Sequence, residues 1–100
     1  MEREKVLTLL RQHQAELEAS GIQTASLFGS VARGEPNPGD VDLAVRFHAD
    51  APKGWDIFPV LDHLEARLRH ILDTEVDILE EPARKPGMQA AIDKDRIVVF

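Results

Sequence analysis

Two aspartates one residue apart, Asp40 and Asp42, stand at the start of the apolar segment 40–47. Aspartate is depleted in β-strands, because a solvated carboxylate gains little on a half-buried pleated surface. Residues i and i+2 of a strand point to the same side of a sheet, so both carboxylates should project together. Two negative charges ~4–5 Å apart repel by about 3–4 kcal/mol at an effective dielectric constant of about 20. This repulsion indicates a bound cation, most simply a divalent metal ion.

A third aspartate, Asp77, lies between Val76 and Ile78 in another apolar segment. If its strand pairs with the strand of Asp40 and Asp42, the three carboxylates can converge. Carboxylate oxygens are hard ligands of the kind that suits Mg²⁺ or Mn²⁺. Two such ions can stabilise the entering and leaving oxygens of an in-line displacement at phosphorus. The three aspartates therefore predict a metal-dependent reaction of a phosphate ester or anhydride.

Gly29 and Ser30 directly follow the apolar segment 22–28. Glycine lacks a Cβ, so the backbone there can approach a ligand closely. The turn after it presents amide hydrogens and the Ser30 hydroxyl to an anion. Phosphate at this turn and magnesium at the aspartates would together hold a nucleoside triphosphate. Arg33, in the same turn, would either neutralise a phosphate oxygen or form a surface ion pair with Glu35.

The apolar spacing predicts the elements that position these residues. Helical stripes are predicted over 3–20, with Gly21 at the C-terminal end, and over 56–72. Four strands and two short helical pieces are also predicted, at 22–28, 40–47, 75–79 and 96–100 and at 30–33 and 88–92. This order predicts one α/β (α+β) domain over residues 1–100, with a mixed β-sheet and helices packed mainly on one face.

The composition excludes several classes of protein. The 100-residue chain is 43% hydrophobic and 30% charged, as expected for a globular domain. It has no cysteine, which excludes disulfides and a cysteine nucleophile. Without a signal-peptide pattern or a long apolar segment, a cytoplasmic protein without membrane association is expected. The net charge of −6 argues against an extended nucleic-acid interface, which normally needs a basic face.

Several conspicuous side chains receive structural interpretations. Trp55 is predicted to anchor a loop on the core, with stacking on an adenine as the alternative. Glu80 and Glu81 are predicted to be exposed, and Arg67 to lie on the solvated face of the long helix. For the strand aspartates, the structural alternative is an ion pair with Arg46 or another base.

Three segments together carry a resemblance to a known family. Phe-Gly-Ser-Val-Ala-Arg-Gly at 28–34, Asp-Val-Asp-Leu at 40–43 and Val-Asp-Ile at 76–78 resemble the nucleotidyltransferase superfamily of DNA polymerase beta. The resemblance is closest to its minimal members, the MntA-type antitoxins encoded beside HEPN-type toxins, and covers nearly the whole chain. It implies that Gly29 and Ser30 hold the triphosphate of ATP, and that Mg²⁺, as two ions, is ligated by Asp40, Asp42 and Asp77. The third aspartate would also lie near the nucleophile, as ligand or proton acceptor.

The same resemblance implies an activity and a partner. Minimal members are expected to transfer AMP from ATP to a tyrosine hydroxyl of a HEPN-type ribonuclease toxin and so neutralise it. This chain contains no tyrosine, so such an acceptor must come from outside. An antitoxin that only binds its toxin, or nucleotidyl transfer to a small molecule, remains an alternative. Gly39 stands where family members often have serine, and the spacing from Ser30 to Asp40 is short for the superfamily; both departures affect loop geometry more than ligand chemistry.

Overall fold

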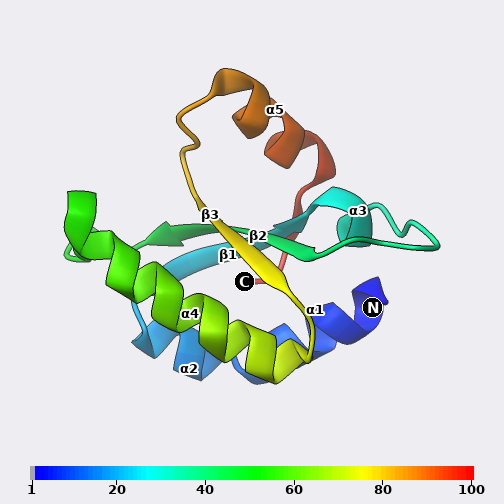
Figure 1. The fold of residues 1–100 in the computed structure, drawn as a ribbon, viewed down its shortest axis with the longest axis horizontal. Coiled ribbons are helices and arrows are strands. Elements are labelled where there is room, and N and C mark those ends of the chain that lie inside the picture. The colour runs from blue at the N-terminus through cyan, green and yellow to red at the C-terminus, as the bar shows by residue number, and fades with distance from the viewer. Residues whose placement is uncertain (1) are drawn as a thin grey trace.

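Four β-strands form one mixed sheet in the computed structural model, which describes residues 2–100 (Figure 1). The sheet order is β3-β2-β1-β4. The strands are β1 (Ile22–Phe28), β2 (Val41–Phe47), β3 (Val76–Glu80) and β4 (Ile97–Val98). β2 runs antiparallel to β1 and parallel to β3, and β4 pairs antiparallel with the other side of β1. The predicted α+β class with a mixed sheet is therefore confirmed.

Three helices, α1 (Arg3–Gln12), α2 (Gln14–Ala19) and α4 (Ile57–Leu72), cover one face of the sheet (Figure 1). The alternating apolar residues of the strands face them, and burial of each large side chain stabilises the fold by roughly 1.5–3 kcal/mol. The largest members of this core include Leu10, Leu17, Leu27, Leu43, Leu64, Leu68 and Leu72. Among the described residues, no helix has the length and apolar character needed to cross a membrane.

The remaining helical pieces lie at the ends of strands. α3 (Gly29–Ala32) is a single turn that directly follows β1, and the 3₁₀ turn η1 (Gly54–Asp56) leads into α4. α5 (Pro86–Asp95) lies on the side of the sheet away from α4 (Figure 1). This arrangement leaves α3 and the adjoining ends of β2 and β3 next to one another.

The structure differs from the predicted elements in three places. The predicted helix 3–20 is interrupted at His13, whose φ of −102° and ψ of 13° lie outside the helical region and separate α1 from α2. α5 is longer than the predicted helix at 88–92, since Pro86 fits the first helical turn, where a missing amide hydrogen costs nothing. β4 is shorter than the predicted strand 96–100, although the amide of Val99 still donates to the Ala25 carbonyl at 2.9 Å.

Candidate active site

Asp42 of β2 and Asp77 of β3 are paired residues in the parallel part of the sheet. Their apolar neighbours, Val41 with Val76 and Leu43 with Ile78, are paired in the same register and share the opposite, helix-covered face. The strand pairing on which convergence of the carboxylates depends is therefore present. It brings two of the three sequence-predicted carboxylates side by side.

The carboxylates repel one another in the folded chain. Burial, followed by repulsion from Asp77 and then Asp40, raises the pKa of Asp42 above its usual range, and the positive charge of Arg33 opposes this shift. Asp40 is exposed and directly precedes β2. Arg46 was the alternative ion-pair partner of the strand aspartates, but its Nη2 instead lies 3.7 Å from Oε2 of Glu81. Within residues 2–100, none of the three aspartates is in an ion pair, so this cluster of negative charge is not neutralised.

The donor set suits Mg²⁺ only if the substrate completes it. In proteins, Mg²⁺ is usually bound by one or two carboxylates together with waters and substrate phosphates, rather than by an all-protein cage. In keeping with this, no group of three or more His, Asp or Glu side chains in the described part of the chain could hold a metal ion by itself. The pair of Asp42 and Asp77, with Asp40 at its rim, supplies hard oxygen ligands of the required kind.

Gly29 lies directly against this cluster. Its φ of 79° is in the left-handed region that glycine adopts without strain. Any Cβ at this position would overlap the Asp42 carboxylate and would lie 3.2 Å from its Cγ. The sequence predicted a close approach of this glycine to a ligand, and the structure shows a close approach to a predicted metal-binding carboxylate. Both the backbone conformation and the nearby Asp42 carboxylate therefore favour glycine at this position.

Ser30 connects the turn to the loop before Asp40. Its Oγ accepts a hydrogen bond of 3.0 Å from the backbone amide of Gly39. A hydroxyl that accepts one hydrogen bond keeps its own hydrogen for donation. Ser30 can therefore still donate to a phosphate oxygen while it holds the loop. The structure thus brings the Gly29–Ser30 turn next to Asp42, which is paired with Asp77, and ties this turn to the residue before Asp40.

Arg33, at the end of α3, contacts two carboxylates. Its Nε donates to Glu35 at 2.9 Å, and its Nη1 donates to Asp95 at 2.6 Å. The pair with Glu35 was one of the two sequence-based alternatives for Arg33. The contact with Asp95 was not predicted, because the two residues lie 62 positions apart in the chain.

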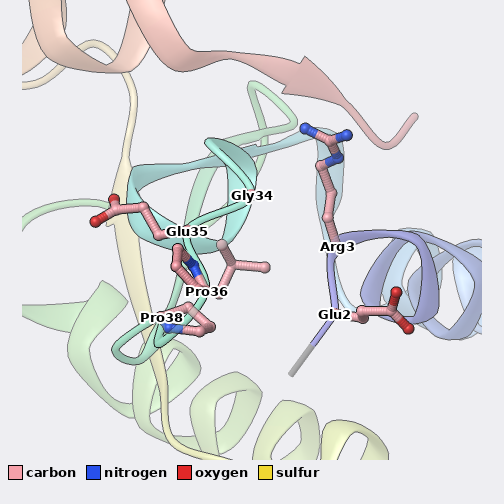
Figure 2. A pocket seen from close by; sticks show the side chains of 7 residues that line it. Glu2, Arg3, Gly34, Glu35, Pro36 and Pro38 are labelled. Atoms are coloured by element: carbon pink, nitrogen blue, oxygen red, sulfur yellow. The ribbon is translucent and has the colours of Figure 1, made fainter.

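A hollow of about 300 Å³ lies beside α3, between the N-terminal end of α1 and the loop that follows Gly34 (Figure 2). Arg3 at its edge donates from Nη1 to the carbonyl of Ala32 at 3.0 Å, so α1 supports the last residue of α3. None of the three aspartates lines this hollow. We therefore assign these residues to support of the turn rather than to the reacting groups.

The interpretation of Trp55 as a core anchor is wrong. Its side chain is 86% exposed, and its ring centroid lies 5.7 Å from that of Phe58. Both aromatic residues, with Leu61 and Ile78, line an open groove of about 530 Å³ beside β3. An isolated aromatic residue before a helix carries no periodic signal, so the sequence could not show in which direction it points.

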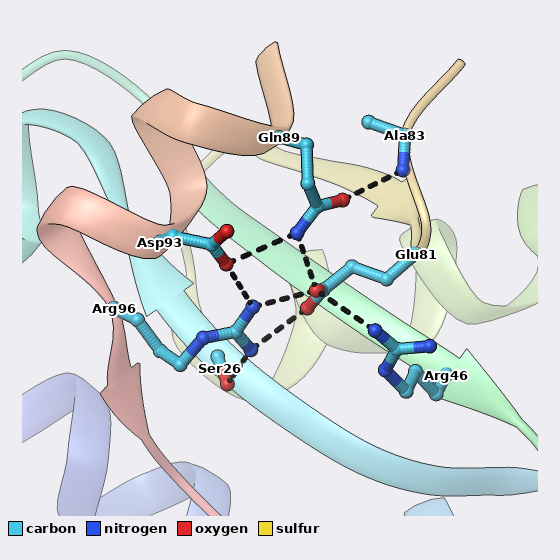
Figure 3. Close-up of polar contacts among 7 residues, drawn as sticks. All are labelled: Ser26, Arg46, Glu81, Ala83, Gln89, Asp93 and Arg96. Carbon is cyan, nitrogen blue, oxygen red and sulfur yellow. Dashed lines mark hydrogen bonds and ion pairs between the residues drawn. The ribbon is translucent and has the colours of Figure 1, made fainter. Parts of the chain in front are cut away.

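The interpretation of Glu81 as an exposed residue is also wrong, whereas Glu80 is exposed. Glu81 accepts hydrogen bonds from Arg96 at 2.9 and 2.6 Å and from Gln89 at 2.9 Å (Figure 3). The hydrogen bonds from Arg96 lower the pKa of Glu81, against the opposing effect of burial. Its partners come from a segment 8–15 residues further along the chain, which no local pattern indicates.

Arg67 is likewise more than a solvated side chain. Its Nη2 donates to Glu16 at 2.9 Å, and its Nε contacts the other oxygen of the same carboxylate. These hydrogen bonds lower the pKa of Glu16 to about 2. The pair joins α4 to α2 and lies on the face away from the aspartates.

Residues 4–100 match the family model described as Polymerase beta, Nucleotidyltransferase. This chain belongs to that family. No curated protein sequence matches the chain.

Solved structures share the same fold. A protein assigned as a minimal nucleotidyltransferase matches with a TM-score of 0.74 and 28% identity, over 97% of this chain and 95% of that chain. A toxin–antitoxin structure with AMP-PNP matches with a TM-score of 0.68 and 22% identity, over 100% of this chain and 73% of that chain. A chain in the complex of a tri-AMPylated Shewanella oneidensis HEPN toxin with MNT antitoxin matches with a TM-score of 0.67 and 20% identity, over 94% and 71%.

Proposed function

We propose that this nucleotidyltransferase is a protein adenylyltransferase that acts as an antitoxin. It would transfer AMP from ATP to a tyrosine hydroxyl of a HEPN-type ribonuclease toxin. The observation that carries the proposal is the register that pairs Asp42 with Asp77 directly against Gly29. The likeness to a complex of MNT antitoxin with a tri-AMPylated HEPN toxin supports the acceptor, and the likeness to a structure with AMP-PNP supports the nucleotide.

The residues of the site have separate roles in this proposal. Asp40, Asp42 and Asp77 would hold Mg²⁺, which when bound neutralises negative charge on the triphosphate. The backbone at Gly29 and the hydroxyl of Ser30 would donate hydrogen bonds to phosphate oxygens. Catalysis of this kind depends mainly on positioning and on charge neutralisation, because phosphoryl transfer asks little covalent chemistry of the protein.

The chemical step is an in-line displacement. The tyrosine oxygen forms a bond to the α-phosphorus of ATP, and the bond from that phosphorus to the bridging oxygen of the β-phosphate breaks. Pyrophosphate leaves with the bonding electron pair, and the hydroxyl proton passes to a carboxylate oxygen of Asp77. The products are the adenylylated toxin and pyrophosphate. The absence of tyrosine in this chain excludes self-modification at tyrosine.

The test is to incubate the chain with Mg-ATP and the HEPN-type protein encoded beside it, and to weigh both proteins by intact mass spectrometry. We expect the partner to gain one or more adenylyl groups. Asp42→Asn should lower the transfer rate by about 10²–10³-fold, as removal of one charge-stabilising group does in other enzymes, while circular dichroism shows a folded chain.

Two results would contradict this proposal. Tight binding without a mass gain would show an antitoxin that acts by contact alone. Transfer by Asp42→Asn at the wild-type rate would remove the metal-binding role of that residue. A partner variant with its acceptor tyrosine changed to phenylalanine serves as the control for the acceptor.

A further inference from the structure

Two adjacent residues at the end of α5 connect the Gly29–Ser30 turn and the strand of Asp77. Asp95 contacts Arg33 at the end of α3, and Arg96 contacts Glu81, which directly follows β3. We propose that Asp95 is a positioning residue that fixes the Gly29–Ser30 turn relative to the aspartates, and that Arg96 anchors it to the sheet. This inference rests on the proposed function, because it names residues that support the same site without touching the nucleotide.

The turn depends on outside contacts for its orientation. α3 has only four residues, and one helical turn is not stable by itself. The backbone amide of Arg33 donates to the carbonyl of Gly29, the first residue of the turn, at 3.0 Å. Asp95 binds the side chain of this same Arg33. A displacement of Arg33 would therefore be transmitted directly to Gly29.

The carboxylate of Asp95 is close to buried, with a side-chain exposure of 10%. Its Oδ2 lies 2.6 Å from Nη1 of Arg33, and a buried charge that loses its partner is strongly destabilising. Asp95 therefore holds Nη1 of the Arg33 guanidinium in a fixed place. Of the two roles that the sequence left open for Arg33, the structure shows the ion pair, with Asp95 as well as with Glu35.

The anchor of Asp95 is the next residue. Arg96 donates to Ser26 of β1 at 2.9 Å and to both carboxylate oxygens of Glu81 (Figure 3). Ser26 lies three residues before Gly29, and Glu81 lies four residues after Asp77. The Arg96 guanidinium thus joins β1, which leads into the turn, to the end of β3, which carries Asp77. Since Asp95 and Arg96 share a peptide bond, the turn and the strands are held to a common point.

The chain offers a matched control. Glu35 also binds Arg33, at 2.7–2.9 Å, but it lies two residues away in the same loop, and its side chain makes no other hydrogen bond or ion pair within residues 2–100. Asp95→Asn and Glu35→Gln each remove one negative partner of the same guanidinium. Only the first weakens the connection to α5, because the asparagine oxygen can accept just a neutral hydrogen bond in place of the ion pair, so the two variants separate positioning from simple loss of charge.

The experiment has two readouts on the full chain. Amide hydrogen exchange at Arg33, Gly34 and Glu35, whose amides donate within the turn at 3.0–3.2 Å, is measured without nucleotide or partner. The KM for Mg-ATP and the maximal rate of partner adenylylation are then measured separately. Thermal unfolding of each variant controls for global loss of structure.

For Asp95→Asn we expect about tenfold faster exchange at the three amides and about a fivefold higher KM, with the maximal rate within about twofold. The expected fivefold change in KM is well below the roughly hundredfold loss of activity that a displacement of 1 Å can cause. Glu35→Gln should stay within about twofold of wild type in every readout. Arg33→Lys, which keeps a charged contact to Asp95, should lie between wild type and Asp95→Asn.

Unchanged exchange in Asp95→Asn, or equal effects of the two variants, would overturn the inference. Faster exchange with an unchanged KM would make Asp95 merely structural and would overturn it as well. A wild-type chain that transfers no AMP would overturn the proposed function alone, and the exchange comparison would still decide whether Asp95 holds the turn.

Discussion

One face of this sheet carries two groups of carboxylates in opposite electrostatic states. Asp42 and Arg46 lie four residues apart in β2, and Glu81, directly after β3, lies four residues from Asp77, so all four share that face. At one end of the strands, the aspartates form no ion pair within residues 2–100, and the pKa of Asp42 is raised. At the other end, Arg96 neutralises Glu81 and lowers its pKa.

The difference separates a group that holds the fold together from one that is arranged for a ligand. A buried carboxylate is normally paired, because an isolated charge in a low-dielectric environment is costly. The pairing around Glu81 follows that rule. Asp42 is half-buried and has no such pair among the described residues, and a perturbed carboxylate among like charges is a frequent mark of a functional site. Four predictions test this contrast.

The largest expected effect is at the neutralised end. Arg96→Met leaves the carboxylate of Glu81, which is 1% exposed, without its main partner. The free energy of unfolding should fall by about 3–5 kcal/mol, the usual result of removing one member of a buried pair. Denaturant unfolding measures it. The double variant Arg96→Met/Glu81→Leu should recover most of the loss, and a loss below about 1 kcal/mol in the single variant would contradict the assignment.

At the end of the strands that carries the aspartates, stability should instead depend on bound Mg-ATP. Mg-ATP at about 100 times its dissociation constant should raise the free energy of unfolding of the wild type by about 2.7 kcal/mol. Asp77→Asn should abolish most of this gain, since it removes one of the oxygen ligands. Thermal unfolding with and without Mg-ATP measures the effect. Glu80→Gln, which removes an exposed carboxylate nearby, should keep the full gain.

The contact between Gly29 and Asp42 gives the third prediction. Gly29→Ala should lower the free energy of unfolding by about 1–2 kcal/mol, because an L-residue is strained at a φ of 79° and its Cβ would overlap the Asp42 carboxylate. Gly87→Ala in α5, where no atom lies within 4 Å of an added Cβ, should instead be neutral or stabilising. Equal results for both variants, measured by denaturant unfolding, would show that the site tolerates a side chain at Gly29.

The smallest effect is in the pH dependence of the metal-free chain. The raised pKa of Asp42 means that the folded chain holds this proton more tightly than the unfolded chain, so stability falls as pH rises above the ordinary aspartate pKa. The lowered pKa of Glu81 has the opposite sign: its contribution is present above the ordinary glutamate pKa and is lost as pH falls below it.

Asp42→Asn should therefore raise the free energy of unfolding near pH 7 by about 0.2–1 kcal/mol, the size of a like-charge cross-strand effect. Denaturant unfolding between about pH 3 and 8 measures both trends. A variant less stable than the wild type at neutral pH would show that Asp42 has a favourable partner.

The sequence by itself determined the elements and the chemistry of the residues in them. Alternating apolar residues located β1, β2 and β3 to within a residue or two, because a period of two is a local property of a strand. Aspartates inside such strands are visible for the same reason. The candidate residues Gly29, Ser30 and Asp42 could therefore be named from local patterns alone.

Tertiary structure decided which of these residues meet. The register that pairs Asp42 with Asp77, the burial of Glu81 beneath Arg96 and the contact of Asp95 with Arg33 all join segments far apart in the chain. A single sequence records the side chains but not the register of the strands or the docking of α5. Those depend on packing of the whole core, which is why the aspartates could be predicted and the residues that hold the turn beside them could not.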